Sequence, residues 1–243
     1  MTQPFTLIAD VFDQLMFDVD YEEWVDYIEA LLTFSDHPVT EILDVACGTA
    51  TPTWILHRRG YRVWGIDRSL PMLRVARRKT GGKVPLLAAD MRMFHLRKQF
   101  DAVLCIFDSL NNLLSEQDLE MAFRRAREHL KDGGVFIFDM NSIAALKDYW
   151  NTDVKVKETP HLVSIWRTTY NSQDHTSRLE ITVFVKRKNG WLRLDEVHVE
   201  RGYPIRTVLG LLHRTGFDRV EAFHHLTLRP ATENSLRFTV VAR

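Results

Sequence analysis

Between residues 41 and 140, short apolar runs alternate with segments of helical periodicity. We expect strands at 41–46, 62–67, 84–89, 101–107 and 134–140, and helices at 52–59, 70–79 and 116–130, the last ended by Gly133–Gly134. Near-continuous apolar strands that alternate with helices are typical of a parallel sheet covered on both faces. This stretch therefore predicts an α/β fold.

The pattern differs on either side of this stretch. Residues 21–34 have one apolar helical face, so we expect a helix that packs on the segments after it. From about residue 150 the period becomes two, which predicts strands at 162–170, 179–188 and 191–201 with a hairpin turn at Asn189–Gly190. A helix from Pro204 to about Thr215, and strands near 217–223 and 236–242, close the chain.

The chain is therefore expected to have three parts. Residues 1–40 form an N-terminal helical cap, residues 41–145 and 203–243 form the core, and residues 146–202 form a small antiparallel β-sheet inserted before the final helix. A chain of 243 residues is long enough for one large domain with such an inserted layer.

Composition excludes several classes of protein. Lys plus Arg equals Asp plus Glu at 32 each, so no long-range field favours nucleic acid or an anionic membrane. Cys47 and Cys105 have neither disulfide nor zinc-site spacing, which favours a reducing, cytoplasmic setting. No apolar run approaches the roughly 18 residues that a spanning helix needs, and the N-terminus lacks a basic leader followed by an apolar run.

The turn after the first strand is the strongest functional signal. Residues 41–50 read EILDVACGTA, in which Asp44 is followed by Gly48, the first glycine of the chain. Asp67 ends the next strand, 19 residues after Gly48. A bare turn lets a ligand approach the backbone, and an acid about 20 residues later can accept hydrogen bonds from ribose hydroxyls. The two strand ends are therefore expected to form a binding site for an adenosine-type cofactor.

The same residues resemble those of a known family. ILDVACGTA (42–50), VWGIDRSLPMLRVARRK (63–79), AADMRMF (88–94), FDAVLCIFDSLNNLL (100–114) and HLKDGGVFIFDMN (129–141) are similar to the class I S-adenosylmethionine-dependent methyltransferases, specifically their small-molecule branch. The resemblance implies a doubly wound, Rossmann-like seven-stranded sheet whose last strand is antiparallel. It also implies S-adenosyl-L-methionine as cofactor and S-adenosyl-L-homocysteine as product.

One departure from the family concerns Ala50, which stands where many members have a second glycine. Because the alanine methyl group is small, we expect the turn to survive.

The resemblance also implies which residues surround the cofactor. The acid at Asp44 is expected near the methionine part, Asp67 on the ribose and Asp90 near the adenine amino group, with Met72 as an apolar wall. Simpler interpretations stay open, since Asp44 and Asp90 also suit turn-holding acids and Met72 suits plain core. The cofactor-binding candidates are Asp44, Ala46, Cys47, Gly48, Thr49, Asp67, Arg68, Met72, Asp90, Met91, Ile106 and Phe107, with Tyr21 and Trp24 as an aromatic lid or as core.

The acceptor side carries weaker signals. Glu196, His198 and Glu200 alternate along one expected strand and so share a face. Because this strand leads into the final helix, the inserted sheet is expected to cover the substrate, with His198 as a candidate base. Asp108, at the end of the fourth strand, is a second catalytic candidate. Arg201 and Tyr203 are further candidates.

Two other positions bear on the site. Asp139 and Asn141 are oxygen ligands two residues apart, but further acidic ligands at matching places are not evident. We therefore expect loop anchors there and no metal. Phe12 stands where many family members have tyrosine, so any hydroxyl role is missing.

The leading hypothesis is transfer of a methyl group to O or N of a small-molecule acceptor by in-line displacement. Residues 107–112 read FDSLNN and lack the Pro-Pro-aromatic signature of base-amino methyltransferases, which with zero net charge counts against nucleic-acid substrates. The alternatives are a non-catalytic S-adenosylmethionine-binding protein, a nicotinamide-dependent oxidoreductase, and aminopropyl transfer. For the oxidoreductase, Ala50 and Thr53 replace glycines of the G-x-G-x-x-G motif. The acceptor is open, and a homodimer is among the oligomeric states left open.

Overall fold

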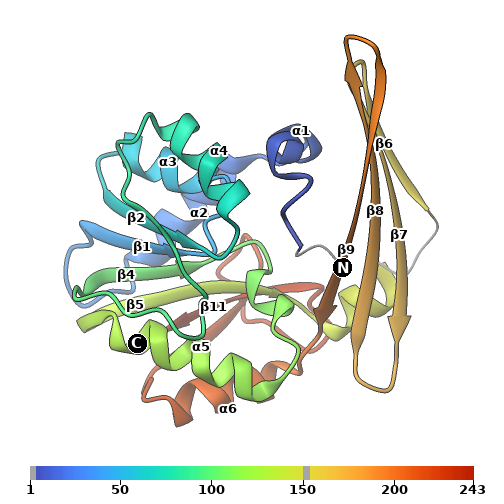
Figure 1. The fold of residues 1–243 in the computed structure, drawn as a ribbon. Coiled ribbons are helices and arrows are strands. Elements are labelled where there is room, and N and C mark those ends of the chain that lie inside the picture. Colours follow the sequence, from blue (N-terminus) through green and yellow to red (C-terminus); the bar gives the residue numbers. More distant parts are fainter. Residues whose placement is uncertain (1–3, 150–153) are drawn as a thin grey trace.

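A seven-stranded sheet forms the centre of the molecule in the computed structural model, which describes residues 4–149 and 154–243 (Figure 1). The strands lie in the order β3-β2-β1-β4-β5-β11-β10, and only β11 runs antiparallel to its neighbours. They are β1 (Glu41–Val45), β2 (Arg62–Asp67), β3 (Leu86–Ala88), β4 (Phe100–Cys105), β5 (Leu130–Asn141), β10 (Val220–His224) and β11 (Arg237–Ala242). The predicted Rossmann-like sheet is confirmed, and its strand order reverses between β1 and β4.

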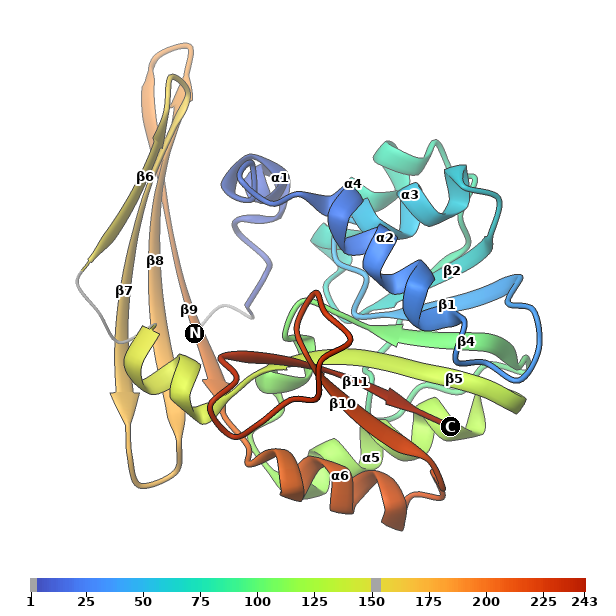
Figure 2. The same ribbon diagram turned by 180° about the vertical axis from the view of Figure 1, so that it is seen from behind.

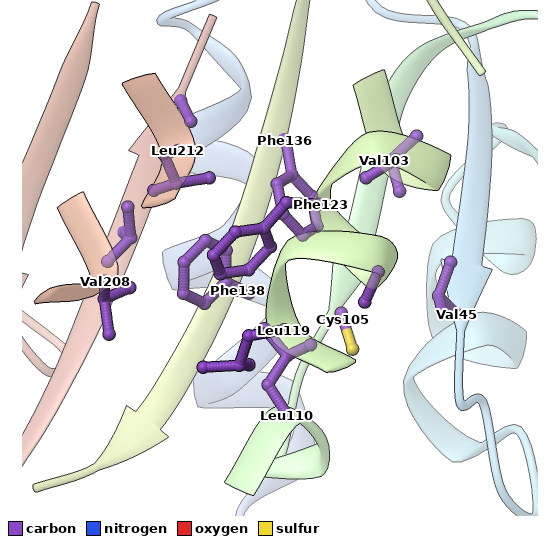
Figure 3. Close-up of a cluster of buried hydrophobic side chains, with 14 of the residues drawn as sticks. Val45, Val103, Cys105, Leu110, Leu119, Phe123, Phe136, Phe138, Val208 and Leu212 are labelled. Carbon is purple, nitrogen blue, oxygen red and sulfur yellow. The ribbon is translucent and has the colours of Figure 1, made fainter. Parts of the chain in front are cut away.

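Helices cover both faces of this sheet. The helices α2 (Tyr21–Leu32), α3 (Thr51–Arg58) and α4 (Leu70–Thr80) lie on one side, and α5 (Glu116–Glu128) and α6 (Ile205–Arg214) on the other (Figures 1 and 2). Alternate strand residues serve the two sides: Ile42 packs with α2, and Leu43 with α5 and α6. In Figure 3, Phe123 of α5 packs against Phe136 and Phe138 of β5. This two-sided burial explains why the strands are apolar throughout.

The inserted sheet stands beside the core. It is antiparallel in the order β6-β7-β8-β9, formed by β6 (Lys155–Thr159), β7 (Leu162–Asn171), β8 (Thr176–Arg187) and β9 (Gly190–Arg201), and it follows the single turn η3 (Ala145–Tyr149). The N-terminal segment, with η1 (Ala9–Val11) and α1 (Phe12–Leu15), lies between this sheet and the core (Figure 1). Its Ile8, Val11 and Leu15 pack against Leu179 and Ile181 of β8. We call residues 4–20 together with β6–β9 the cover.

Some boundaries differ from those expected. The inserted sheet has four strands, whereas three were predicted. The additional strand, β6, was not predicted because it is charged and largely exposed and so carries little apolar signal. The helix expected to reach residue 130 ends at Glu128, and Gly133–Gly134 lie within β5, where a Cβ on Gly134 would come 2.8 Å from the Asp101 carbonyl oxygen. The β8–β9 turn consists of residues 188–189, one position earlier than predicted.

Parts of the expected cap and insert, residues 1–3 and 150–153, lie outside the described residues. Within the described part of the chain, no helix combines the length and apolar character needed to cross a bilayer.

Candidate active site

A cavity of about 330 Å³ lies where the strand order of the main sheet reverses. Such reversals are where open α/β sheets bind ligands. Sixteen of the site residues predicted from the sequence line this cavity: Tyr21, Trp24, Asp44, Ala46, Cys47, Gly48, Thr49, Asp67, Arg68, Met72, Asp90, Met91, Ile106, Phe107, Asp108 and His198. The core thus supplies one end of the cavity, and the cover supplies walls that include Phe5, Phe12, Trp166 and Ile181.

The turn after β1 is joined directly to the end of β2. The Gly48 N–H donates to Asp67 Oδ2 at 2.8 Å, and the Ser69 N–H donates to Asp67 Oδ1 at 2.7 Å. Gly48 is left-handed at φ 54°, and a Cβ there would meet nothing within 4 Å, so the turn has open space beside it. Each Asp67 oxygen keeps a lone pair for another donor.

Ala50 adopts the left-handed conformation with φ 60°. Its N–H donates to the Cys47 carbonyl at 2.8 Å, and its own carbonyl accepts from the Trp54 N–H in the first turn of α3. The expected survival of the turn is confirmed. The conformation also gives the reason why glycine suits this position, since left-handed φ costs an alanine roughly 1–2 kcal/mol.

Asp44 is a buried carboxyl with an unpaired oxygen. Its Oδ2 accepts from the Thr53 hydroxyl, and its Oδ1 has no hydrogen-bond partner among the described residues. Burial raises the pKa of Asp44 to about 7. A buried oxygen without a donor favours a cationic or hydrogen-bonding group beside it.

Asp90 and Met72 each had two predicted roles, in the cavity lining and in the protein's own structure. The Asp90 carboxylate accepts from Arg92 Nε at 2.9 Å and Nη2 at 2.7 Å, and these bonds lower its pKa. Asp90 is therefore a turn acid that also lines the cavity. Met72 is only 1% exposed and lines the cavity too, so it is core and wall at once.

Aromatic rings form one side of the cavity. The Trp24 ring stacks on Phe107 with centroids 3.9 Å apart, and Tyr21 lies 5.2 Å from the same ring. Trp24 also belongs to the core beneath α2. Trp24 is therefore part of the core and also part of the cavity wall.

A polar cluster lies where the ends of β4 and β5 meet the start of β11, with β4 between it and β1. Asp139 accepts the backbone N–H groups of Phe107 at 2.7 Å and Asp108 at 3.0 Å, and Arg237 Nε at 2.7 Å. Asn141 Nδ2 donates to Asp108 Oδ2 at 3.0 Å and to Glu200 Oε2 at 3.2 Å. These bonds agree with the interpretation of Asp139 and Asn141 as loop anchors.

Glu196 fastens the N-terminal segment to β9. Its two oxygens accept four backbone N–H groups, from residues 5–8, at 2.5–3.2 Å. Glu196 also lies 3.0 Å from His198 Nε2, and the His198 ring packs edge-on against Phe5 at 4.3 Å. Ser69 on the core side donates to the Phe5 carbonyl at 2.6 Å. The cover is thus tied to the core beside Asp67.

Comparison with known proteins agrees with this geometry. A family model described as a methyltransferase domain matches residues 42–134. The putative methyltransferase YqeM of Bacillus subtilis is 30% identical over 212 residues, which cover 86% of this chain and 84% of that protein. The chain belongs to the S-adenosylmethionine-dependent methyltransferases. It is a class I enzyme of this family, and S-adenosylmethionine is its cofactor.

Two further relatives of this methyltransferase are informative. The crystal structure of an S-adenosylmethionine-dependent methyltransferase from Clostridium acetobutylicum is 27% identical, covers 97% of each chain and superposes with a TM-score of 0.86. A dTDP-3-amino-3,6-dideoxy-alpha-D-glucopyranose N,N-dimethyltransferase of Streptomyces fradiae is 33% identical over 120 residues, 49% of this chain and 47% of that protein. With methyltransferases as its relatives, the oxidoreductase alternative has no support.

Two predicted residues of the methyltransferase are not at the cavity. The Tyr203 hydroxyl donates to the Leu113 carbonyl at 2.5 Å, and Arg201 donates to the Leu114 carbonyl at 2.9 Å while its guanidinium lies 4.8 Å from the Tyr203 ring. Neither side chain is part of the cavity lining. Their prediction as catalytic candidates is wrong, because both side chains hold the loop before α5.

Sequence reasoning also missed residues that do line the cavity. Arg237 opens β11, far along the chain from every motif, and no local pattern marks it. Phe5 and Ile8 line the cavity from the N-terminal segment, whose backbone is held by Glu196, a residue far along the chain. Glu200 had a signal, its period-two spacing from His198, but its partners lie on other strands.

Proposed function

We propose that this methyltransferase transfers a methyl group to the nitrogen of a small-molecule amine held in the cavity, by in-line displacement. The observation that carries the proposal is the charge of the lining. It includes five carboxyl groups, Asp44, Asp67, Asp90, Asp108 and Glu200, against the guanidinium groups of Arg68 and Arg237. An acidic, partly desolvated wall attracts a cation such as a protonated amine.

The core end would hold the cofactor. The open space at Gly48 and the free lone pairs of Asp67 suit a ribose, and the unpaired Asp44 oxygen suits the amino group of the methionine part. The sulfonium supplies an activated methyl group. The protein's task is to align the acceptor and exclude water, and such alignment can be worth roughly 7–11 kcal/mol.

The relatives named for nitrogen methylation support an amine acceptor. The Streptomyces fradiae protein is named for methylating an amino sugar nucleotide, and it matches 49% of this chain. That partial match supports nitrogen as the acceptor atom and leaves the rest of the acceptor to be identified.

Asp108 and His198 are our candidates for proton transfer, with the cover as the acceptor wall. Both line the cavity. His198 is held by Glu196 and packed on Phe5, so the surroundings favour Asp108, which has one oxygen toward Arg237 and the other toward Asn141. We further propose a cytoplasmic location, where free thiols such as Cys47 and Cys105 stay reduced.

The test is an acceptor screen with S-adenosylmethionine that pairs each amine with the matching alcohol. Release of S-adenosylhomocysteine and the mass of the product report the transfer. We expect methylated amines and unmodified alcohols. Transfer only to hydroxyl groups would overturn the choice of nitrogen, and tight cofactor binding without transfer to any member would favour the non-catalytic alternative.

A further inference from the structure

At the acceptor end, three carboxyl groups lie close together, and one guanidinium pairs with two of them. Arg237 donates to Asp139 from Nε at 2.7 Å and to Asp108 from Nη2 at 2.5 Å. Its positive charge is therefore already paired with two acids. Glu200, which reaches the same cluster from β9, forms no ion pair within the described residues. The cluster has more acid than base.

Asn141 holds Glu200 next to Asp108. One amide nitrogen, Nδ2, donates to Asp108 at 3.0 Å and to Glu200 at 3.2 Å, and both carboxyl groups line the cavity. Two carboxyl groups held this close cannot both ionise without a proton or a cation between them. Burial first, and then the charge of Asp108, raise the pKa of Glu200 well above its ordinary value.

Among the described residues, no basic side chain forms an ion pair with Glu200. The His198 Nε2 atom is next to Glu196, and Arg201 points to the Leu114 carbonyl. Burial, and next Arg237, lower the pKa of His225 to about 3, so that ring is uncharged. Among the described residues, Asp108 is joined to Glu200 through Asn141, and Arg237 links Asp108 to Asp139. The cluster therefore lacks one positive charge to balance Glu200. Because Glu200 lines the cavity, a cation can reach it from there.

We propose that Glu200, paired with Asp108 by Asn141, is a further catalytic residue that binds the acceptor nitrogen and takes its proton in place of Asp108, which is already paired with Arg237. This inference rests on the proposed N-methylation and narrows the acceptor to amines basic enough to be cations in water. Trp24 and Trp166 also line the cavity, and the Trp24 ring lies 4.9 Å from the Arg237 guanidinium. Neutral aryl amines and alcohols lack the charge that this cluster needs.

The proton balance of the step is simple. A protonated amine enters while Glu200 holds a proton, and one proton leaves to solvent. The Glu200 carboxylate then takes a second proton from the ammonium, which frees the nitrogen lone pair. The nitrogen forms a bond to the methyl carbon as the carbon–sulfur bond breaks, and that electron pair stays on sulfur. The product is a methylated ammonium, and overall one proton is released.

The test compares benzylamine with benzyl alcohol as probes, bound to the enzyme saturated with S-adenosylhomocysteine near neutral pH. Calorimetry in two buffers of different ionisation enthalpy gives the affinity and the protons released. We expect benzylamine to bind roughly tenfold tighter or more, because one buried charge pair supplies at least that factor. We also expect release of up to one proton for each benzylamine bound and none for the alcohol.

Variants assign this behaviour to Glu200. Glu200→Gln keeps a partner for Asn141 but no charge, so the preference for benzylamine and the proton release should both be lost. Glu200→Asp should keep them, and Glu180→Gln, an exposed change on β8, should match the wild type. Unchanged melting temperature and S-adenosylhomocysteine affinity in Glu200→Gln would show that the fold is intact.

Two outcomes separate this inference from the proposed function. If Glu200→Gln still prefers benzylamine and still releases a proton, the role of Glu200 is wrong even if amines are methylated. If the wild type shows the preference and the variant loses it while no amine is ever methylated, the cation site stands and N-methylation fails.

Discussion

The seven-stranded core and the cover hold the cavity in different ways. The core fixes its residues through the backbone, as in the bond from Gly48 to Asp67, and through strands buried on both faces. Within the cover, Glu196 and the Lys157–Asp18 pair join the N-terminal segment to the inserted sheet. The N-terminal segment is joined to the core by polar contacts such as the Arg78–Asp10 pair and the bond from Ser69 to the Phe5 carbonyl. Exposed ion pairs contribute only about 0–1 kcal/mol each. The cover should therefore open at a lower free energy than the core unfolds.

This difference indicates that the core and the cover have separate roles. Cofactor affinity should depend mainly on core residues, and access to the cavity on the cover. Mutations in each part test this contrast, and the largest effect is expected in the core.

Asp67→Ala should have the largest effect, because it acts at the centre of the core end. Loss of two charge-assisted bonds to a ribose, each worth about 1.5–3 kcal/mol, should weaken S-adenosylhomocysteine binding by roughly a hundredfold or more in calorimetry. The melting temperature should also fall, since Gly48 and Ser69 lose their acceptor. Asp218→Ala, an exposed change, is the control. Unchanged affinity would remove Asp67 from the site.

Asp44→Asn tests the electrostatics of the core through pH. Burial raises the pKa of Asp44 to about 7, so its contribution to stability is present at low pH. It is lost as the pH rises from the ordinary aspartate value of about 3.9 through about 7, by as much as about 4 kcal/mol. Asn keeps an oxygen for the Thr53 hydroxyl. Urea unfolding should show the wild type losing stability relative to the variant across that range. Parallel pH profiles would contradict the assignment.

Glu196→Ala tests the cover alone. Without the four bonds from Glu196, amide hydrogen exchange in residues 5–15 should accelerate roughly tenfold or more, equivalent to about 1.4 kcal/mol, while amides of β4 and α5 keep their rates. Asp195→Ala changes the preceding residue, which bonds Thr182 and Arg193 instead, and should leave residues 5–15 unaffected. Equal acceleration in β4 would mean that cover and core open as one unit.

Acid should open the same contact. Bonds from His198 and from backbone N–H groups outweigh burial and lower the pKa of Glu196. Its contribution is present above the ordinary glutamate value of about 4.3 and is lost as the pH falls through the lower folded value. Exchange in residues 5–8 of the wild type should therefore approach that of Glu196→Ala only in acid. Full protection retained at the lowest pH at which the core stays folded would contradict this.

Ala50→Gly should have the smallest effect. Glycine relieves the left-handed strain of about 1–2 kcal/mol but adds unfolded-state entropy worth about 0.4–1 kcal/mol. The net change should be a stabilisation between about 0 and 1.6 kcal/mol, a rise of roughly 0–6 °C in melting temperature by calorimetry. A clear loss of stability would mean that the alanine methyl packs favourably enough to offset the strain.

The sequence predicted the core better than the cover, for physical reasons. Strands such as β4 and β5 are buried on both faces and carry a continuous apolar signal, and the Gly48-to-Asp67 spacing reflects one local turn. The cover is defined by contacts between residues far apart in sequence, such as Glu196 with Phe5, separated by 191 positions. No local pattern encodes such a pair.

The same reason explains the errors at the acceptor end. Arg201 ends the strand that carries His198 and Tyr203 follows it, yet their side chains turn to carbonyls of the loop before α5. Arg237 lies 129 positions from Asp108, so their ion pair appears only when β11 is placed beside β5. Strand pairing, rather than residue type, decided which polar groups meet.

A crystal structure with bound S-adenosylhomocysteine tests the central claim most directly. We predict the nucleoside between Gly48 and Asp67, with the open side of the sulfur facing Asp108 and Glu200. A nucleoside bound elsewhere, or a sulfur atom turned away from those two carboxyl groups, would contradict the account.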